Sequence, residues 1–472
     1  MKFGTSGLRG LVVELEGRPS AVYATAFAKY LLETGASLPG GTILVGRDLR
    51  PSSPGIASIC MGALERAGLT PVDCGEIPTP ALALQGAIAK APCLMITGSH
   101  IPADRNGIKF YTPTGEITKT DELNIQSVAV QLFGADIDFS AGTAEDRQDA
   151  AVKLFLSRNY SVLPRSALTG LKIGLYEHST VARDLLRSVL EHFGAHVIPL
   201  GRSESFVPVD TEALEAETLA NFAKWAIAFD LDAIVSSDGD GDRPLMADEF
   251  GRQIRGDVIG VFTSSFLGAN VVVTPVTSNS SIESVVSSAV VRTRVGSPFV
   301  IAAMEETISD SVGSVIGFEA NGGAMVGSTF TVATGVISPL MTRDSFLPIL
   351  AVLSARAIKQ KPLSELVSEL GLSSASSDRL EHFPIDLSAK LMLELTADEN
   401  VRSFFAALGE VVSCERIDGV RVSFPGGMSA HLRPSGNAPE MRCYTEAGSE
   451  DASREMLVNL MAHVRKWADS RT

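Results

Sequence analysis

Cysteine is scarce in this sequence of 472 residues. The cysteines are odd in number and include no CxxC pair; they are Cys60, Cys74, Cys93, Cys414 and Cys443. A set of this kind predicts reduced thiols that serve as small hydrophobic residues of the core, in a cytoplasmic protein.

Long apolar runs are also absent. A membrane-spanning helix needs roughly 18 consecutive apolar residues, and the most apolar stretch, 258–276, is interrupted by serine, threonine, glycine and asparagine. The first residues, MKFGTSGLRG, contain no apolar segment of the kind that a secretory signal has. We therefore expect neither a membrane partner nor secretion.

Positive charge is in deficit. The chain has 40 Lys and Arg against 55 Asp and Glu, which gives a formal net charge of −15. An acidic surface of this size argues against nucleic acid or an anionic membrane as partner. An anionic small substrate would need a local cluster of Arg, Lys and backbone N–H groups. Hydrophobic residues make up 45% and charged residues 20%, which argues against disorder.

Strands and helices are expected to alternate through the first three quarters of the chain. The expected strands are 42–46, 71–74, 93–96, 171–176, 196–200, 232–235, 271–274, 291–295 and 314–317. The expected helices are 54–67, one with Thr79 as N-cap and Pro80 as first residue, 179–193, 211–229, 257–267, 281–289 and 298–308. Such alternation predicts α/β layers with largely parallel sheets, which bind ligands at the carboxyl ends of their strands.

The last quarter has a different pattern. Short strands are expected at 411–414, 420–424 and 441–446, followed by a helix at 453–467, with the Ser-rich segment 373–378 as a linker. The predicted fold class is three successive mixed or parallel-sheet α/β domains plus a C-terminal α+β domain around a central cleft. The expected domains are 1–147, 148–252, 253–370 and 371–472.

A polar loop, TGSHIPADRNGIKF, follows the expected strand 93–96. Ser99 lies in a tight turn after Gly98, and the ten residues to Lys109 allow the chain to fold back and place an ammonium beside the hydroxyl. A serine with a nearby cation and a metal suits phosphoryl transfer. Taken alone, the segment is also typical of an ordinary polar turn.

A second loop, DGDGDR, follows the expected strand 232–235. Asp238, Asp240 and Asp242 alternate with glycine, so a tight coil brings three carboxylates together and calls for a divalent cation, Mg²⁺ or Ca²⁺. An EF-hand would have its glutamate at Glu249, which is present, but its glycine position is Arg243 and a strand precedes the loop instead of a helix.

Two further loops carry candidate substrate contacts. In GFEANGG, Glu319 and Asn321 offer a carboxylate and an amide, which suit the adjacent hydroxyls of a sugar. In RPSGNAPEMR, Arg433, Ser435 and the following turn offer a guanidinium, a hydroxyl and backbone N–H groups for a phosphate. Each loop alone is compatible with a plain turn, whereas the four together, one in each expected domain, indicate a sugar-phosphate enzyme.

The sequence resembles the α-D-phosphohexomutases, the family of phosphomannomutases, phosphoglucomutases and phosphoglucosamine mutases, over essentially its whole length. The matching motifs are the four loops, FGTSGLRG at 3–10, VGRDLRPSS at 45–53 and RTRVG at 292–296. The resemblance implies a mutase that interconverts hexose 6-phosphate and hexose 1-phosphate through a phosphoserine. The intermediate is a hexose 1,6-bisphosphate, which also serves as activator.

The resemblance also implies roles for single residues. Ser99 matches the serine that carries the phosphoryl group, and the three aspartates match the Mg²⁺ ligands, completed by a phosphoserine oxygen. Lys109 and Arg9 match residues near the transferring phosphoryl group, and His100 either lines the site or caps the turn. The residues that match substrate contacts are Arg243, Glu319, Asn321, Arg433, Ser435, Gly436 and Asn437.

The chain departs from the family pattern in three loops. Ile101 stands where an asparagine is common, and the phosphate loop, which usually reads Ser-Asn/Gly-Thr-Glu-Pro, has Asn437 and Ala438 in place of the threonine and glutamate. In the sugar loop, Asn321 and Gly323 stand where the family often has serine and histidine. These sugar-loop residues favour a phosphomannomutase with some glucose activity. The expected assembly is a monomer or a homodimer, between which the sequence does not decide. The alternatives are a phosphoglucosamine mutase, a phosphatase or kinase that shares the acidic loop, and a non-catalytic sugar-phosphate-binding relative.

Overall fold

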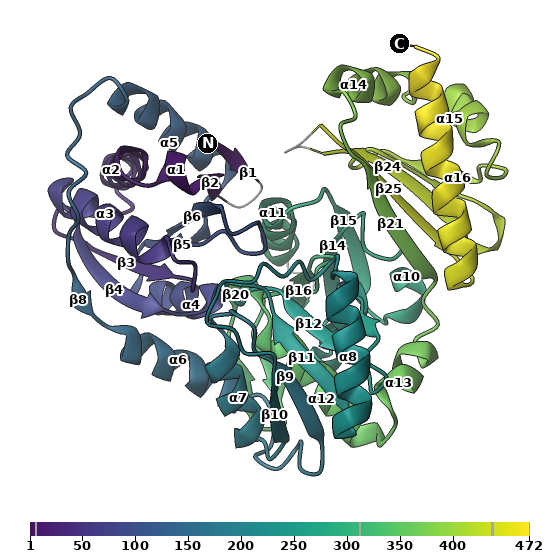
Figure 1. Ribbon diagram of the computed structural model, residues 1–472, viewed down its shortest axis with the longest axis horizontal. Helices are drawn as coiled ribbons and strands as arrows, with labels where there is room; N and C mark the ends of the chain where they lie inside the picture. Colours follow the sequence, from purple (N-terminus) through teal and green to yellow (C-terminus); the bar gives the residue numbers. More distant parts are fainter. Residues whose placement is uncertain (5–6, 311–312, 436–438, 472) are drawn as a thin grey trace. The chain divides into compact units, whose positions relative to one another are not determined.

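The computed structural model describes residues 1–4, 7–310, 313–435 and 439–471 (Figure 1). It divides into two compact units. Unit 1 consists of Met1–Val272 and Gly296–Val367, and unit 2 consists of Val273–Val295 and Ser368–Thr472. Each unit is described by itself below.

The N-terminal sheet of unit 1 has the strand order β1-β2-β6-β5-β3-β4-β8, with β7 paired to β6. It is mixed, because β3 runs parallel to β4 and β5 whereas β5 and β6 are antiparallel. Its strands are β1 (Lys2–Gly4), β2 (Gly7–Leu11), β3 (Thr42–Arg47), β4 (Thr70–Glu76), β5 (Cys93–Ile96), β6 (Arg105–Thr112), β7 (Gly115–Glu116) and β8 (Glu145–Asp146). The helices are α1 (Val12–Leu15), α2 (Arg18–Glu33), α3 (Ser53–Arg66), α4 (Thr79–Ala89) and α5 (Lys119–Leu132). α2 contacts both α3 and α5, and their buried alanine, leucine and phenylalanine side chains form the core with this sheet.

The second sheet of unit 1 has the order β10-β9-β11-β12-β13. β9 runs parallel to β10 and β11, and β12 returns antiparallel to β11. Its strands are β9 (Lys172–Tyr176), β10 (His196–Leu200), β11 (Ala233–Ser237), β12 (Pro244–Ala247) and β13 (Gln253–Ile254). The helices of this part are α6 (Gln148–Tyr160), α7 (Arg183–His192) and α8 (Ala216–Phe229).

The rest of unit 1 contains β16 (Val315–Phe318), β17 (Ala324–Val326) and β20 (Leu340–Asp344), which pair antiparallel in that order. A small hairpin joins β18 (Phe330–Val332) to β19 (Gly335–Ile337). The helices are α9 (Gly256–Leu267), α11 (Ser297–Ser309), α12 (Phe346–Lys359) and α13 (Leu363–Glu369). β5, β11 and β16 are buried along their whole length, as expected of strands covered on both faces. The candidate loops follow the carboxyl ends of these strands.

Unit 2 is built on an antiparallel sheet of order β21-β25-β24-β23-β22, with α16 against β21 and β25 (Figure 1). The strands are β21 (Ser374–Leu380), β22 (Ser413–Glu415), β23 (Val420–Ser423), β24 (Ser429–Pro434) and β25 (Met441–Ala447). The helices are α14 (Ile385–Glu394), α15 (Asp398–Phe405) and α16 (Glu450–Asp469), with a short 3₁₀ turn, η1 (Pro425–Gly427). β14 (Val271–Pro275) enters this unit from unit 1 and is followed by α10 (Ile282–Val285) and β15 (Ala289–Thr293).

Three mixed α/β layers followed by an α+β domain confirm the predicted fold class as a four-domain α/β protein. Several local predictions are wrong. The Ser-rich segment expected as a linker lies mostly in β21, because its backbone pairs with β25 along the whole strand. The expected helix 281–289 is a single turn, α10, because β15 already begins at Ala289.

Two helix starts also differ from the prediction. Thr79 is the first residue of α4 with Pro78 at the N-cap, and its hydroxyl donates to Asp240 instead of capping the helix. The helix expected from residue 179 begins at Arg183, because the hydroxyl of Thr180 bonds to that of Ser237 and holds this segment in a loop. In both places a tertiary contact overrides the local cap signal.

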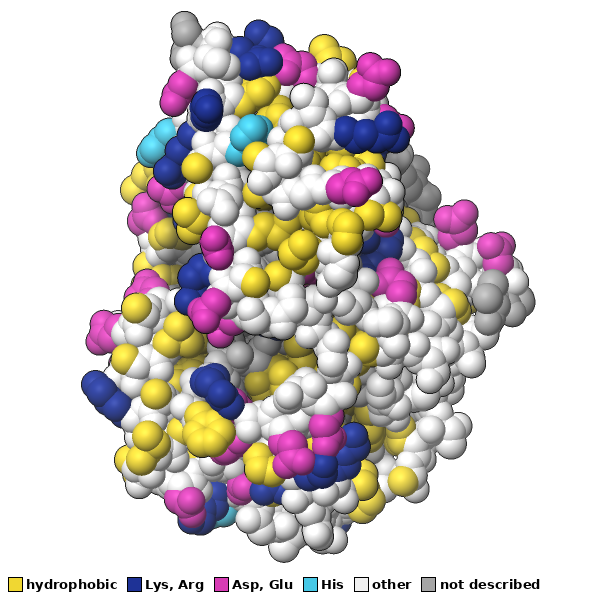
Figure 2. All heavy atoms as spheres, turned by 90° about the vertical axis from the view of Figure 1, so that its right-hand side faces the viewer, with side chains coloured by type: hydrophobic (Ala, Val, Ile, Leu, Met, Phe, Trp, Pro, Cys, Tyr) yellow, Lys and Arg dark blue, Asp and Glu magenta, His cyan; other side chains and the backbone are white. Residues whose placement is uncertain are grey.

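Among the described residues, no helix combines the length and the apolar character needed to cross a bilayer. Acidic and basic side chains are interspersed on the face drawn in Figure 2. On that face the excess negative charge is therefore distributed, not gathered into one field.

Candidate active site

Ser99 lies in the turn between β5 and β6, where its backbone adopts a left-handed conformation with φ of 53°. Such a conformation is costly for a residue with a Cβ and is found mostly where the surrounding structure enforces it. The backbone N–H of Ser99 donates to Oγ1 of Thr97 at 2.8 Å. Its Oγ donates to Oδ2 of Asp238 at 2.5 Å and lies 3.1 Å from Nδ1 of His100. The loop thus directs the serine hydroxyl at the acidic loop.

A buried guanidinium holds the serine loop in this shape. Arg50 donates to the carbonyl oxygens of Ser99 and Ile101 at 3.0 and 2.6 Å, and also to those of Pro102 and Arg105 at 2.8 Å. Asp48 in turn accepts from the hydroxyls of Thr97 and Ser53 at 2.7 and 2.6 Å, and its ion pair with Arg50 measures 3.3 Å. These contacts account for the motif VGRDLRPSS as the support of the serine loop.

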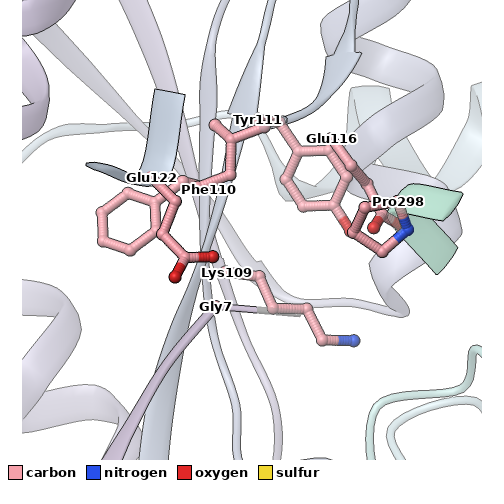
Figure 3. A pocket seen from close by; sticks show the side chains of 8 residues that line it. Gly7, Lys109, Phe110, Tyr111, Glu116, Glu122 and Pro298 are labelled. Carbon is pink, nitrogen blue, oxygen red and sulfur yellow. The ribbon is translucent and has the colours of Figure 1, made fainter. Parts of the chain in front are cut away.

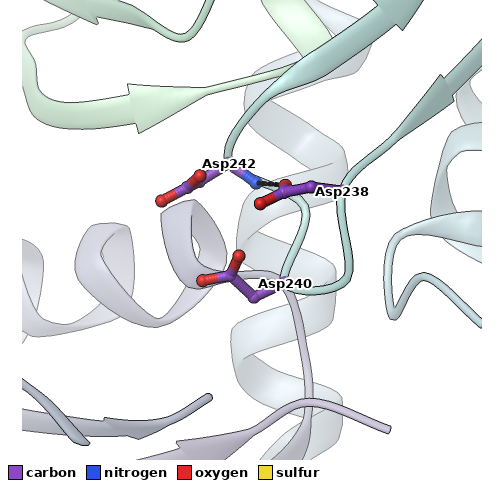
Figure 4. Close-up of side chains that lie close together, drawn as sticks. All are labelled: Asp238, Asp240 and Asp242. Carbon is purple, nitrogen blue, oxygen red and sulfur yellow. Dashed lines mark hydrogen bonds between the residues drawn. The ribbon is translucent and has the colours of Figure 1, made fainter. Parts of the chain in front are cut away.

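Asp238, Asp240 and Asp242 converge in the loop between β11 and β12 (Figure 4). All three are buried, and one carboxylate oxygen from each lies within 4.8 Å of the others. Oδ1 of Asp238 accepts from the backbone N–H of Asp242 at 3.2 Å, the bond drawn in Figure 4. A side chain at Gly239 would collide with Ser99, since its Cβ would lie 2.7 Å from the serine carbonyl oxygen.

Within the described residues, Asp240 and Asp242 each have one oxygen that accepts hydrogen bonds and one that accepts none. Lys109 donates to Oδ2 of Asp240 and to Oδ2 of Asp242, both at 2.6 Å, and Thr79 donates to Oδ2 of Asp240 at 2.6 Å. Oδ1 of Asp240 and Oδ1 of Asp242 are buried without a hydrogen bond. Buried carboxylate oxygens are costly unless something neutralises them. A set of oxygen ligands whose lone pairs accept no hydrogen bond fits a hard divalent cation.

The charges of this loop shift one another's protonation. Burial and repulsion from the other two aspartates raise the pKa of Asp238 well above its usual value. Burial also acts to raise the pKa of Asp242, but Arg343 and Lys109 outweigh it and hold that pKa far below its usual value. Burial would lower the pKa of Lys109, yet Asp240 and Asp242 raise it overall. The lysine is therefore a permanent cation of the site.

Arg9 and Arg243 add positive charge to the site, and His100 lies beside the serine hydroxyl as a neutral ring. Arg9 comes from β2, opposite Gly107 of β6, and burial together with Arg243 lowers its pKa to about 10. Arg243 lies 3.8 Å from Asp242 and from Glu212. Burial, Arg243 and Arg9 lower the pKa of His100 well below its usual value, so its ring is neutral at pH 7. The cations of the site thus offset the charge of its carboxylates locally.

Glu319 and Asn321 lie in the turn after β16, and both are buried. Oδ1 of Asn321 accepts from the backbone N–H of Gly323 at 3.0 Å, which fixes the turn. Oε2 of Glu319 accepts from Arg343 of β20 at 2.9 Å. The same guanidinium donates to Oδ2 of Asp242 at 2.8 Å, so it joins the sugar loop to the acidic loop.

A small pocket in unit 1 is lined by Lys109 together with Gly7, Tyr111, Glu116 and Pro298, among others (Figure 3). Figure 3 shows Tyr111 beside Glu116, which is its cross-strand partner. Glu116 accepts from the hydroxyls of Ser297 and Thr342 at 2.7 and 2.9 Å. These contacts fix β7 against α11 and β20.

The predicted phosphate loop belongs to unit 2. Arg433 lies on β24 and is largely buried, with its Nε 3.6 Å from Oδ2 of Asp418. The backbone N–H of Ser435 donates to the carbonyl of Glu440 at 2.9 Å. Gly436 and Asn437 lie outside the described residues.

Sequence reasoning singled out the side chains that meet in unit 1 but not those that hold them. Arg50 and Asp48 were seen only as parts of a family motif, and Thr79 was assigned to helix capping. Arg343 was missed altogether. The available signal was an arginine and an aspartate between two apolar stretches, LM and FLPIL, because charge so placed is buried only when it is paired.

The chain is similar to known proteins over most of its length. The family described as phosphoglucomutase/phosphomannomutase matches with its alpha/beta/alpha domain I at residues 1–131, domain II at 153–251 and domain III at 256–371. A phosphomannomutase of Sinorhizobium fredii is 52% identical over 98% of each chain, and one of Salmonella muenchen is 39% identical over 98% of this chain and 96% of its own. A phosphoglucosamine mutase of Geobacillus kaustophilus is 26% identical over 98% of each chain.

Solved structures show the same fold. A phosphoglucomutase/phosphomannomutase family protein of Burkholderia thailandensis matches with a TM-score of 0.77 at 20% identity, covering 98% of this chain and 96% of that one. The family models span most of this chain, and its similarity to the two phosphomannomutases runs over nearly its whole length. The chain therefore belongs to the phosphoglucomutase/phosphomannomutase family, the α-D-phosphohexomutase isomerases.

Proposed function

We propose that this enzyme interconverts mannose 6-phosphate and mannose 1-phosphate through phospho-Ser99 and a mannose 1,6-bisphosphate, with some activity on glucose phosphates. The observation that carries the proposal is the direct contact of Ser99 with Asp238 inside a buried acidic triad. Both phosphomannomutase relatives, of which one shares half of its residues with this chain, support mannose as substrate.

Ser99 is the proposed carrier of the phosphoryl group. In the forward step the bond between phosphorus and Oγ of Ser99 breaks as a bond forms from phosphorus to O1 or O6 of the hexose phosphate, and the proton that this sugar hydroxyl loses returns to Oγ. The resulting bisphosphate reorients, and its other phosphoryl group returns to Oγ. Nδ1 of His100 lies 3.1 Å from Oγ of Ser99, and we assign this atom to hold the proton of the serine hydroxyl during the transfer. Lys109, Arg9 and Arg243 neutralise the charge on the transferring oxygens, which supplies most of the catalysis in reactions of this type.

The acidic triad is the proposed Mg²⁺ site. Its oxygen-only donor set and the two unpartnered buried oxygens, on Asp240 and Asp242, fit a hard cation better than Zn²⁺, which prefers nitrogen and sulfur. When bound, the ion supplies neutralisation and orientation of the transferring phosphoryl group. Lys109 occupies Oδ2 of Asp240 and Oδ2 of Asp242, which leaves Oδ1 of each carboxylate for the ion.

Glu319 and Asn321 are the proposed contacts of the sugar hydroxyls. Within the described part of the chain, Oε1 of Glu319 accepts no hydrogen bond, so it is available to a substrate hydroxyl. Arg433 and Ser435, with Gly436 and Asn437, are proposed to hold the phosphate that is not being transferred. The largely buried guanidinium of Arg433 supports this role. A hexose 1,6-bisphosphate is the proposed activator, because it can phosphorylate Ser99.

A coupled assay tests the proposal. Purified enzyme with Mg²⁺ and a hexose 1,6-bisphosphate is offered mannose, glucose and glucosamine 1-phosphates, and formation of each 6-phosphate is followed. We expect the highest kcat/KM for mannose 1-phosphate and a modest decrease for glucose 1-phosphate, because the two differ in the orientation of one hydroxyl. A strong preference for glucosamine 1-phosphate would overturn the mannose assignment.

The remaining alternatives give different results in the same assay. A kinase would require ATP, and a phosphatase would release inorganic phosphate in place of the isomeric sugar phosphate. A non-catalytic relative would show no turnover and no phosphate on Ser99 by mass spectrometry after incubation with the bisphosphate. The similarity to the phosphoglucosamine mutase is distant, which ranks that alternative below the mannose enzyme.

A further inference from the structure

Gly323 stands where the sugar loop of the family often has a histidine, and the space beside it is filled from another strand. A Cβ on Gly323 would lie 2.8 Å from Cδ and 2.9 Å from Cγ of Arg343, and 2.9 Å from the backbone oxygen of Asp242, closer than real Cβ atoms come. The backbone of Gly323 is outside the left-handed region, so its conformation does not require glycine. Glycine is required by the lack of space, because the side chain of Arg343 and the backbone of Asp242 occupy the place that a side chain at position 323 would need.

Arg343 bridges two loops of the site. Its Nη1 donates to Oε2 of Glu319 at 2.9 Å, and its Nη2 and Nε donate to Oδ2 of Asp242 at 2.8 and 3.2 Å. The side chain is 3% exposed. A buried guanidinium without partners would be strongly unfavourable, whereas planar contacts to two carboxylates satisfy it and fix their orientation.

The backbone on both sides of Arg343 is anchored. The hydroxyl of Thr342 donates to Glu116, and the carboxylate of Asp344 accepts from the backbone N–H of Phe346 at the start of α12. In addition, Asp344 lies opposite Ala324, the residue after Gly323, in the pairing of β20 with β17. The guanidinium is therefore presented from a fixed strand and not from a mobile loop.

We infer that Arg343 supplies from β20 the cation that the family's sugar loop often supplies as a histidine, and that it positions Glu319 for the substrate. By occupying Oε2 of Glu319 it leaves Oε1 for the hydroxyls of the hexose. The inference rests on the proposed function in one respect, that the substrate is a hexose phosphate. Unlike histidine, arginine keeps its charge at every physiological pH.

The test compares the substrate with analogues that lack the hydroxyls at C3 or C4. For wild type, Arg343→Met, Gly323→Ala and Glu319→Gln, kcat/KM is measured on mannose 1-phosphate and on its 3-deoxy and 4-deoxy forms. The ratio of parent to analogue is the readout, because a smaller active fraction of enzyme cancels in it. We expect a wild-type ratio on the order of tenfold to a hundredfold at one hydroxyl or both, as for hydrogen bonds to a charged group.

Loss of the positioning contact should bring this ratio close to one in Arg343→Met and Gly323→Ala, as in Glu319→Gln. Arg343→Lys should retain part of it, since an ammonium keeps the charge but not the planar contacts. Two matched controls should keep the wild-type ratio. Arg356→Met removes another arginine of an ion pair in unit 1, and Gly335→Ala adds a Cβ with no atom within 4 Å.

A second readout does not depend on turnover. The Kd of mannose 1-phosphate, measured by calorimetry without Mg²⁺, should rise in Arg343→Met and in Gly323→Ala by the factor lost in the ratio. An unchanged ratio and Kd in both variants would overturn the inference, as would an unchanged ratio in Glu319→Gln. If Arg343→Met does not fold, Gly323→Ala decides. Failure of the proposed function shows separately, as wild type that does not turn over mannose 1-phosphate; the same comparison then uses its preferred hexose phosphate.

Discussion

Ser99 combines a left-handed backbone with a buried hydroxyl directed at Asp238. The sequence predicted a serine presented to a cleft, and the structure places it among contacts that leave 2% of the residue exposed. That geometry is held from outside the serine by Arg50 and Thr97. Removing the hydroxyl therefore leaves the loop in place and deletes only the acceptor of the phosphoryl group.

Ser99→Ala should lower turnover by more than about a thousandfold, as loss of a covalent nucleophile does. The free energy of unfolding should change by only about 1 kcal/mol, because one buried hydrogen bond is lost without a large cavity. Steady-state kinetics and thermal unfolding measure the two effects. Ser161→Ala, which removes a half-buried hydroxyl outside the site, is the matched control. Wild-type turnover in Ser99→Ala would exclude the phosphoserine assignment.

Asp240 tests the acidic loop at the same scale. Its Oδ2 is occupied by Lys109 and Thr79, while Oδ1 is buried without a partner. Asp240→Asn keeps the shape but loses the charge that a cation requires. We expect kcat to fall on the order of a hundredfold with KM changed less than about threefold, because the lost interaction acts on the transferring group. Asp232→Asn is the control, and a raised KM with unchanged kcat would contradict the prediction.

At the scale of elements, the site depends on how closely two loops approach. The loop after β11 touches the loop after β5 at Gly239, where a Cβ would lie 2.7 Å from the carbonyl oxygen of Ser99. That atom is backbone held by Arg50, so it cannot yield easily. A methyl group at position 239 must push the carboxylates away from the serine.

Gly239→Ala should therefore reduce kcat by about a hundredfold or more, since misplacement on the order of 1 Å has effects of that size. Both loops should remain folded, because their own supports are intact. The control is Gly134→Ala, whose Cβ would meet its nearest atom at an ordinary 3.7 Å. Circular dichroism and steady-state kinetics separate misplacement from misfolding. Near-normal turnover would show that the two loops can move apart freely.

Some helices and strands could be predicted from the sequence, and others could not. Strands such as β5 and β11 were predictable because they are short apolar runs followed by polar loops, and the loops themselves carry residue types that chemistry requires. β21 was not predictable from its serines, because its pairing with β25 comes from a segment about 65 residues away. Thr79 and Arg343 show the same limit, since their roles depend on partners from distant elements. The local propensity of a segment for helix or strand does not predict such tertiary contacts.

At the scale of the whole molecule, each unit contains, apart from His100, a buried neutral histidine, and the two are held in the same way. In unit 1, Nε2 of His178 donates to the carbonyl oxygen of Ser237 at 2.8 Å, and in unit 2, Nε2 of His431 donates to that of Asp418 at 2.6 Å. Nδ1 has no hydrogen-bond partner in either ring. Burial lowers the pKa of each to about 4, so protonation in the folded state would place an unsatisfied charged N–H in the interior.

The sign of the pH effect follows from these values. Between about pH 6.5 and pH 4 the unfolded chain binds a proton at each histidine and the folded chain does not, so acid favours unfolding. As the pH falls through that range, each histidine should therefore lower the free energy of unfolding of its unit by about 1.4 kcal/mol per pH unit. The sequence has two tryptophans, Trp225 in unit 1 and Trp467 in unit 2, so intrinsic fluorescence can follow each unit.

His178→Gln should reduce the acid sensitivity of unit 1 and leave that of unit 2 unchanged. The glutamine amide can still donate to Ser237, but it binds no proton in either state. Urea unfolding between pH 7.5 and 5.0 would be followed through Trp225 in a Trp467→Phe background, and through Trp467 in a Trp225→Phe background. The free energy of unfolding followed at Trp225 should depend less steeply on pH, by the binding of about one proton. The dependence followed at Trp467 should keep its slope, to which His431 contributes. An unchanged slope at Trp225 would contradict the prediction. It would mean that His178 is protonated as readily in the folded chain as in the unfolded one, despite the burial of its Nδ1 without a hydrogen-bond partner.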